Sequence, residues 1–257
     1  MNMTGKQTRI SMKTSHIMQV YLGEYPGSRS DSDKKFLRAV ESFINQNDKD
    51  SELIIVSDSC QIVHKLYYEH FKSEPRIKYV FVDKDVPSMY EDTNDGKPYY
   101  RGLPRQVGRS LASGEIISYM DSDDFLKEDA VSIIKKYWSH HLKQDDFKWS
   151  MTSRWVDNQK AIEFWAPSPS TTTFGETFKI EGLEDLWVEC GMTDPSLVMS
   201  ATFSISHVRD LPVEWVDKID HPSEDTVFAN KMYKTGKGFV IQEPYYVRCH
   251  YSNQWDY

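Results

Sequence analysis

The sequence of 257 residues contains no uninterrupted apolar run close to the roughly 20 residues that a membrane-spanning helix needs. The polar segment 1–15 carries no apolar stretch of the kind found in secretory signal peptides. Cysteine is scarce: Cys60, Cys190 and Cys249 are widely separated and match no zinc-binding pattern. We therefore predict no integral membrane segment and a location in a reducing cytoplasm, that of the host cell for a viral protein.

Excess positive charge is absent as well. The formal net charge of −8 argues against a dedicated nucleic-acid binder, which usually shows a basic domain. Two sets of basic residues are nevertheless evenly spaced: Arg101, Arg105 and Arg109, and Lys231, Lys234 and Lys237. Either set has a spacing that lines one side of a helix, although such runs are usually solvated helix faces.

What is present is enough apolar material for a core, with 39% hydrophobic and 13% aromatic residues. The first half alternates short apolar runs with segments of helical periodicity. We expect strands at 17–23, 53–56, 77–82 and 116–120, and helices at 32–46, 61–72, 103–112 and 128–140. Gly114 is expected as the glycine that ends the third helix. Such alternation predicts an α/β fold with a mostly parallel central sheet and helices on both faces.

The second half is less regular. We expect strands at 147–156, 161–165, 202–206 and 239–241, and a helix at 224–234. Residues 83–99 are rich in Asp, Pro and Gly and predict a long loop. No repeat or compositional shift marks a linker, so we expect a flexible leader at 1–15 and a single domain at 16–257.

The acidic end of the fourth expected strand is the most informative feature. The apolar run 116–120 leads directly into Asp121, Ser122, Asp123 and Asp124. Carboxylates this close raise one another's pKa unless a cation intervenes, and Mg²⁺ and Mn²⁺ prefer such oxygen ligands. In open α/β sheets, ligands bind beyond the carboxyl ends of the strands. The alternative is an acidic loop that caps the next helix, with Asp124 or a neighbour as N-cap.

Five stretches stand in an order known from one family. They are Leu53-Ile-Ile-Val-Ser-Asp-Ser59, Gly102-Leu-Pro-Arg-Gln-Val-Gly-Arg-Ser-Leu-Ala-Ser-Gly-Glu115, Tyr119-Met-Asp-Ser-Asp-Asp124, His221-Pro-Ser-Glu-Asp225 and Val247-Arg-Cys-His-Tyr-Ser252. From about Ile17 to Ser252, the chain thus resembles the family 2 glycosyltransferases of the GT-A fold. The third stretch matches the DxD segment of that family. The sequence departs from the pattern at Tyr21-Leu-Gly-Glu-Tyr25, at Ser57-Asp58 and at Gln106, which replaces the usual Asn.

The resemblance implies a Rossmann-like GT-A sheet with a nucleotide-sugar-binding half at 16–126 and an acceptor-side half at 127–257. It assigns a set of residues to the donor nucleotide: Tyr21, Gly23, Glu24, Asp58, Arg105, Asp121 and Ser252. It assigns Asp123 and His250 to a bound Mn²⁺ or Mg²⁺, although a lone histidine is more often a surface or core residue. Asp58 can accept a hydrogen bond from the N3–H of uracil but not from cytosine, so we expect a UDP-sugar.

The same resemblance assigns Asp225 as the catalytic base. The acceptor hydroxyl is a poor nucleophile near neutral pH, and a carboxylate can take its proton in the transition state. Asp225 lies 102 residues after Asp123 (225 − 123), so it can come from another wall of the site. A base opposite the leaving group implies inversion of the sugar. Glu224 and Asp225 can also be ordinary first-turn acids behind a Ser223 cap.

The expected function is therefore metal-dependent transfer of a hexosyl or pentosyl group to a glycan hydroxyl. Hydroxymethylated bases in phage DNA are an alternative acceptor, and proteins or small molecules follow. A metal-dependent nucleotidyltransferase also uses paired Asp residues, but it needs a Gly-rich phosphate loop, for which Gly23-Glu-Tyr-Pro-Gly27 is a poor match. A non-catalytic nucleotide-sugar-binding module is the remaining alternative.

Overall fold

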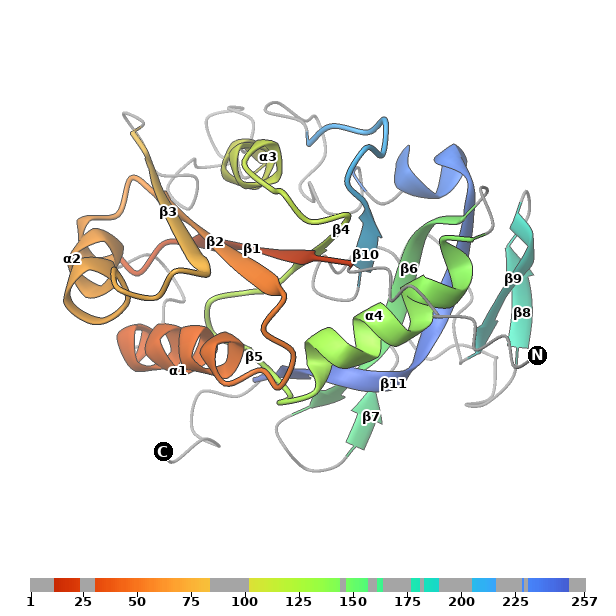
Figure 1. Ribbon diagram of the computed structural model, residues 1–257, viewed down its shortest axis with the longest axis horizontal. Helices are drawn as coiled ribbons and strands as arrows, with labels where there is room; N and C mark the ends of the chain where they lie inside the picture. The colour runs from red at the N-terminus through yellow and green to blue at the C-terminus, as the bar shows by residue number, and fades with distance from the viewer. Residues whose placement is uncertain are drawn as a thin grey trace, which may run out of the picture.

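A computed structural model describes residues 12–23, 31–83, 102–143, 147–156, 161–163, 177–180, 183–189, 205–215, 228 and 231–249. Within this part of the chain, a sheet of nine strands forms the centre of the molecule (Figure 1). Eight of its strands follow the order β3-β2-β1-β4-β10-β6-β11-β5, and β7 pairs with β6.

The first half of the chain forms four parallel strands. They are β1 (Thr14–Val20), β2 (Ser51–Asp58), β3 (Ile77–Val82) and β4 (Ile116–Tyr119). Three helices alternate with them: α1 (Ser32–Ile44), α2 (Gln61–His70) and α3 (Gly102–Ser110). All eight residues of β2 are buried, as expected for a strand covered on both faces. Figure 1 shows α3 on one face of the sheet and α1 on the other.

The second half extends the sheet beyond β4. It contributes β5 (Phe125–Leu126), β6 (Phe147–Val156), β7 (Ala161–Glu163), β10 (Ile205–Val208) and β11 (Lys237–Arg248). It also forms α4 (Ala130–His141), the 3₁₀ helix η4 (Tyr233–Thr235) and a separate hairpin of β8 (Thr177–Ile180) and β9 (Leu183–Glu189). Strand β10 runs antiparallel to β4 and β6, whereas β11 runs parallel to β6. Six of the nine strands therefore point in one direction, which confirms the expected mostly parallel α/β sheet.

Several predicted boundaries are wrong, each for a physical reason. Strand β1 ends at Val20 rather than at Gly23, and it begins at Thr14, inside the expected leader. Its polar start is buried because side chains satisfy one another: the hydroxyl of Ser118 lies 2.7 Å from Nδ1 of His16. Burial lowers the pKa of His16 to about 4, so this histidine is neutral at pH 7.

Strand β11 is far longer than the predicted 239–241, because a register shift between Ile241 and Tyr246 accommodates Pro244 within it. The hairpin β8–β9 and the short β5 were not predicted at all. Of the expected helix 224–234, only Phe228 and the residues from Lys231 onward lie within the described residues.

Gly114 has a different role from the one predicted. Helix α3 ends earlier, at Ser110, so Gly114 is not its terminating glycine. A β carbon at this position would lie 2.7 Å from the carbonyl oxygen of Lys13 and from the backbone nitrogen of Ser15. Gly114 is therefore required because the chain entering β4 passes very close to the backbone of β1.

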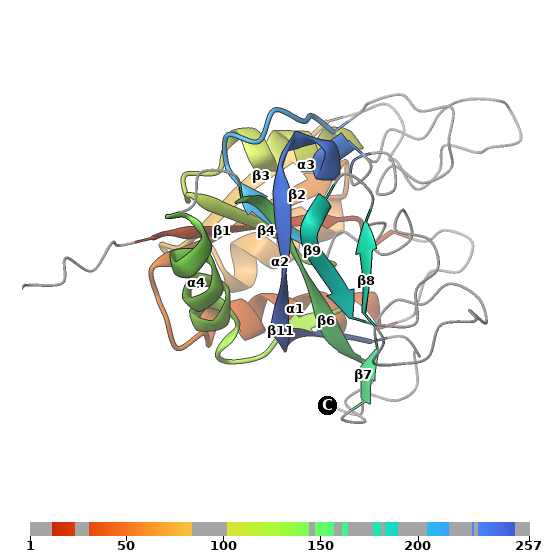
Figure 2. The ribbon, with the colours of Figure 1, turned by 90° about the vertical axis from the view of Figure 1, so that its right-hand side faces the viewer.

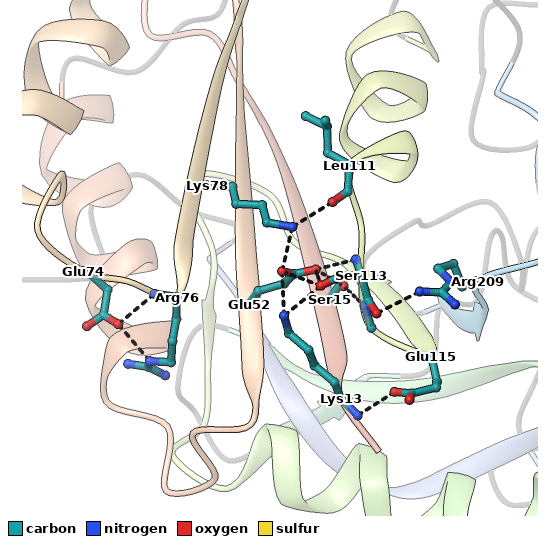
Figure 3. Close-up of polar contacts among 11 residues, drawn as sticks. Lys13, Ser15, Glu52, Glu74, Arg76, Lys78, Leu111, Ser113, Glu115 and Arg209 are labelled. Carbon is teal, nitrogen blue, oxygen red and sulfur yellow. Dashed lines mark hydrogen bonds and ion pairs between the residues drawn. The ribbon is translucent and has the colours of Figure 1, made fainter. Parts of the chain in front are cut away.

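A buried carboxylate joins the amino ends of three strands (Figure 3). Glu52 of β2 accepts hydrogen bonds from Lys13 at 2.9 Å, from the hydroxyl of Ser15 at 2.6 Å and from the backbone N–H of Ser113 at 2.6 Å. Lys78 of β3 approaches the same carboxylate at 3.0 Å. Burial alone would raise the pKa of Glu52, but these donors outweigh it and hold the pKa well below its usual range.

Replacing Glu52 with glutamine should destabilise the fold by about 3 kcal/mol at pH 7, because it leaves two lysines without their buried partner. Since the folded pKa of Glu52 is depressed, its contribution is present above the unfolded pKa of about 4.3 and is lost as pH falls further. Urea unfolding at pH 7 and pH 3 should therefore show a smaller difference between variant and wild type at the lower pH. Glu69→Gln, in an exposed pair with Lys65, is the control and should change little. Equal losses at both sites would contradict the assignment.

Candidate active site

The candidate site lies at the carboxyl ends of β1, β2 and β4. The chain proceeds outward from β1 to β3 and then returns to β4, on the other side of β1, so the strand order reverses between β1 and β4. The N–H of Met120 donates to the carbonyl of Ile17 at 3.0 Å, which keeps the two strands paired up to the acidic loop. Open α/β sheets bind ligands at such a reversal.

The acidic loop is anchored by its last carboxylate. Asp124 is buried and accepts hydrogen bonds from the backbone N–H of Cys249 at 2.7 Å and from the hydroxyl of Tyr246 at 2.8 Å. The same hydroxyl accepts the N–H of Asp121 at 3.0 Å. Burial, followed by the charges of Asp123 and Asp121, raises the pKa of Asp124 well above its ordinary value. Asp124 therefore fixes the loop to β11 and does not face a ligand.

The capping alternative is not what the structure shows. The N-cap of α4 is Asp129, five residues after Asp124, and its side chain makes no capping hydrogen bond. The clustered acidic residues at the end of β4 therefore do not cap α4.

Arg38 of α1 provides a second anchor. Its guanidinium donates to the carbonyl oxygen of Asp123 at 2.8 Å, contacts the sulfur of Cys249 at 3.1 Å and lies 5.0 Å from the centre of the Phe125 ring. Helix α1, the acidic loop and β11 are therefore held together by one cation. This contact keeps the backbone of Asp123 in place through its carbonyl oxygen and does not use its carboxylate.

Two carboxylates of the loop remain accessible. The side chain of Asp121 is 40% exposed, and Asp123 is partly exposed. The guanidinium of Arg105, from α3, lies 4.0 Å from Asp121 and 5.1 Å from the centre of the Trp215 ring. No group of three or more His, Cys, Asp or Glu residues able to hold a metal occurs in the described part of the chain. Mg²⁺ and Mn²⁺ are commonly held by one or two carboxylates together with substrate phosphates, so Asp121 and Asp123 fit such a cation.

The wall beside Arg105 is a buried chain of hydrogen bonds. The indole N–H of Trp215 donates to the hydroxyl of Tyr119 at 3.0 Å, and that hydroxyl lies 2.9 Å from Nε2 of His207. Nδ1 of His207 faces the carbonyl of Val208 at 2.7 Å, so Nδ1 carries the proton and Nε2 accepts. Burial lowers the pKa of His207 to about 3, consistent with a neutral ring. Trp215 is therefore a rigid surface against which Arg105 lies.

Gln106, where the resembled family usually has Asn, supports the same wall. Its side-chain oxygen accepts the backbone N–H of Trp215 at 3.0 Å. The indole is also stacked on Phe228, with ring centres 4.0 Å apart and planes inclined by 2°. The substitution at position 106 is thus accommodated by a contact that fixes Trp215.

The other described residues that the sequence assigns to the donor nucleotide lie near the ends of β1 and β2. Asp58 is the last residue of β2 and is fully buried, 3.4 Å from the side-chain nitrogen of Gln19. Ser59 follows with φ of 54°, in the left-handed region, and both its N–H and its hydroxyl donate to Val82 at 2.9 Å. Tyr21 packs against the core, and a β carbon at Gly23 would lie 2.2 Å from its hydroxyl.

The structure thus brings Asp121, Asp123 and Arg105 together and places Tyr21, Gly23 and Asp58 at neighbouring strand ends. Glu24, Asp225, His250 and Ser252 lie outside the described residues, and their roles stay predictions. The sequence reasoning missed four anchoring residues: Arg38, Asp124, Tyr246 and Cys249. No local signal distinguishes them, because each acts through a partner far away in the sequence.

No described helix has both the length and the apolar composition needed to cross a membrane. No protein-family model matches the sequence. A segment of 124 residues is 28% identical to chondroitin synthase from Escherichia coli; it covers 48% of this chain but only 15% of that protein.

Solved structures of TarS from S. aureus share the fold over nearly the whole chain. The fragment TarS 1-349 matches with a TM-score of 0.61 and 19% identity, covering 93% of this chain and 60% of the fragment. Its complex with UDP-GlcNAc matches with a TM-score of 0.63 and 17% identity, again covering 93% of this chain and 59% of the fragment. The GT-A fold is thereby confirmed, and the resemblance to family 2 glycosyltransferases is supported by these matches. The chain spans about 60% of the solved TarS fragment.

Proposed function

We propose that this chain is an inverting glycosyltransferase that moves a sugar from a UDP-sugar to a hydroxyl of a glycan. The observation that carries the proposal is the pair of accessible carboxylates, Asp121 and Asp123, at the reversal of strand order in a GT-A sheet. A TarS fragment of the same fold was solved with UDP-GlcNAc, which supports a nucleotide-sugar as the donor.

The donor end would be organised by residues from β4 and α3. Asp123 and Asp121 would hold Mn²⁺ or Mg²⁺, which when bound neutralises charge that develops on the leaving diphosphate. Arg105 contributes a second positive charge from the side of α3. Its position between Asp121 and the Trp215 ring directs the guanidinium toward the same strand end, where it can donate to phosphate oxygens. His250 is proposed as a further metal ligand.

Asp58 would select uridine, which requires that its carboxylate, buried in this structure, face the bound base. Its carboxylate lies at the end of β2, one strand away from the segment of Tyr21 and Gly23. A carboxylate accepts a hydrogen bond from the N3–H of uracil, whereas the N3 of cytosine has no hydrogen to donate. A site built around one such bond discriminates against a base that leaves it unpaired.

Asp225 would take the proton of the acceptor hydroxyl. This role rests on the resemblance of His221-Pro-Ser-Glu-Asp225 to the family pattern, since Asp225 lies outside the described residues. A base on the acceptor side and a diphosphate on the other side of the sugar lead to direct displacement with inversion.

Product analysis tests the proposal. The chain is incubated with Mn²⁺, a panel of UDP- and CDP-sugars, and acceptors that include glycans and hydroxymethylated DNA, and products are identified by mass spectrometry. We expect UDP and a glycosylated glycan, with UDP-sugars used in preference to CDP-sugars. Glycosylated DNA would identify the alternative acceptor. Release of pyrophosphate would instead reveal a nucleotidyltransferase, and donor binding without any turnover would reveal a binding module.

A further inference from the structure

A pocket of about 1010 Å³ lies beside α3, outside the carboxylate site. Its walls come from three segments that are distant in the sequence: α3, residues 209–215 after β10, and residues 231–235 around η4. Figures 1 and 2 show these segments at the same end of the molecule, with 209–215 running between α3 and η4. The pocket is large enough for several groups of a polymeric ligand, since small-molecule sites typically measure roughly 300–1,000 Å³.

The lining of this pocket is strongly cationic. It includes four basic side chains, Arg109, Arg209, Lys231 and Lys234, and one carboxylate, Glu214. This local excess is opposite in sign to the net charge of −8 of the whole chain. The two evenly spaced basic sets of the sequence thus meet here, Arg109 from the arginine set and Lys231 and Lys234 from the lysine set.

Arg109 is held in place for such a role. Its Nη2 donates to the backbone carbonyl of Leu211 and lies 3.4 Å from that of Arg209. Its other terminal nitrogen, Nη1, is buried and has no hydrogen-bond partner among the described residues. A buried guanidinium donor without an acceptor is costly, and an anion in the pocket would satisfy it.

The pocket adjoins the candidate active site. Gln106 and Trp215 line the pocket. The Trp215 ring also contacts the guanidinium of Arg105, which lies beside Asp121 in the candidate active site. Arg105 and Arg109 are four residues apart on α3, a rise of about 6 Å along the helix. A chain seated in the pocket therefore reaches the sugar-transfer site within the length of a few of its own units.

We propose that the pocket binds phosphodiester groups of the acceptor chain while the acceptor hydroxyl is held at the active site. That the bound chain is the acceptor rests on the proposed function. Binding of phosphate groups in the pocket does not depend on sugar transfer. Cations from three segments surround the space and approach a ligand from different directions. Guanidinium and ammonium groups are both common partners of phosphate oxygens, and a chain with one negative charge on each phosphodiester can pair with several of these cations at once.

Binding measurements on the full chain test the pocket. The probes are a fluorescent short linear polyphosphate, a polygalacturonate of matched charge, a sugar-phosphate oligomer and a DNA duplex, at low salt. Wild type should bind the polyphosphate, and Lys231→Glu/Lys234→Glu should bind it roughly tenfold or more weakly, because like charges then face the ligand. The control Lys65→Glu/Lys72→Glu reverses two exposed lysines on and beside α2, with the same change in net charge, and should stay within about twofold.

The outcomes separate cleanly. Equal weakening in both double variants, or tighter binding of polygalacturonate than of polyphosphate, would overturn the proposal. Competition by the sugar-phosphate oligomer or by the duplex supports it and identifies which source carries the phosphodiester. Titration of the same proteins with UDP and Mn²⁺ tests the proposed donor site separately from the pocket. If wild type binds polyphosphate but not UDP, the proposed donor site is contradicted and the pocket proposal is not. Thermal unfolding verifies the variants, and Lys231→Gln/Lys234→Gln replaces the charge reversal where that variant is unstable.

Discussion

Replacing Asp225 with asparagine should reduce sugar transfer by at least about 10²-fold, within the range of about 10²–10⁴-fold that general-base catalysis contributes. Asparagine keeps the size of the side chain and much of its hydrogen bonding, but it cannot accept the proton of the acceptor hydroxyl. The loss should appear in kcat, since the base acts only as the transition state forms. Steady-state transfer assays with a saturating UDP-sugar measure it.

The donor side should be unaffected by this change, because the base faces the acceptor and not the diphosphate. Calorimetric titration with UDP and Mn²⁺ should give nearly the same affinity for Asp225→Asn and wild type. The neighbouring Glu224→Gln is the matched control and should retain most of the activity. The anomeric proton of the product, observed by NMR, should show inversion relative to the donor. Near-normal turnover of Asp225→Asn, or retained configuration, would remove Asp225 from this role, and Glu224 or Asp220 would be tested next.

Replacing Asp123 with asparagine should remove most of the divalent-dependent affinity for UDP. An amide carries no charge and is a much weaker ligand for Mn²⁺ or Mg²⁺ than a carboxylate. The fold should survive, because the contact of Asp123 with Arg38 uses its backbone carbonyl, which the substitution keeps. The difference between UDP titrations with Mn²⁺ and with a chelator, measured for both proteins, reports the effect.

Two comparisons make the Asp123 result specific. Asp210→Asn applies the same chemical change to an exposed residue after β10 and should leave UDP affinity unchanged. Asp124→Asn should behave differently from both, because the buried carboxylate accepts the N–H of Cys249 and the hydroxyl of Tyr246, and its loss should lower the thermal unfolding midpoint. Unchanged divalent-dependent binding in Asp123→Asn would show that this carboxylate is not a ligand.

Much of the fold could be predicted because its signals are local. The apolar run of β2 is typical of a buried parallel strand, and β3, at the edge of the sheet, has the bounds expected from the sequence. The start of β1 gave no such signal, since it is polar; His16 and Ser15 are buried there because Ser118 and Glu52 satisfy them. Those partners lie 102 and 37 residues away in the sequence, so no local pattern contains the information.

The candidate site divides in the same way. The sequence by itself determined that carboxylates stand at the tip of a buried strand, since the apolar run and the acids are adjacent. Only the tertiary structure decided which of them is accessible: Tyr246 and Cys249, more than a hundred residues later, bury Asp124, whereas Asp121 stays exposed beside Arg105.

The two basic sets illustrate the limit most clearly. Their regular spacing was visible in the sequence by itself, but periodicity reports only which side of a helix a residue occupies and not what that side faces. Strand β10 pairs with β4, and the chain after it crosses toward α3, which brings Arg109 into one pocket with Lys231 and Lys234. These basic residues, which by sequence resembled solvated helix faces, therefore line one pocket because of long-range strand pairing. That pairing depends on contacts distributed over the whole sheet, so no local pattern reveals it.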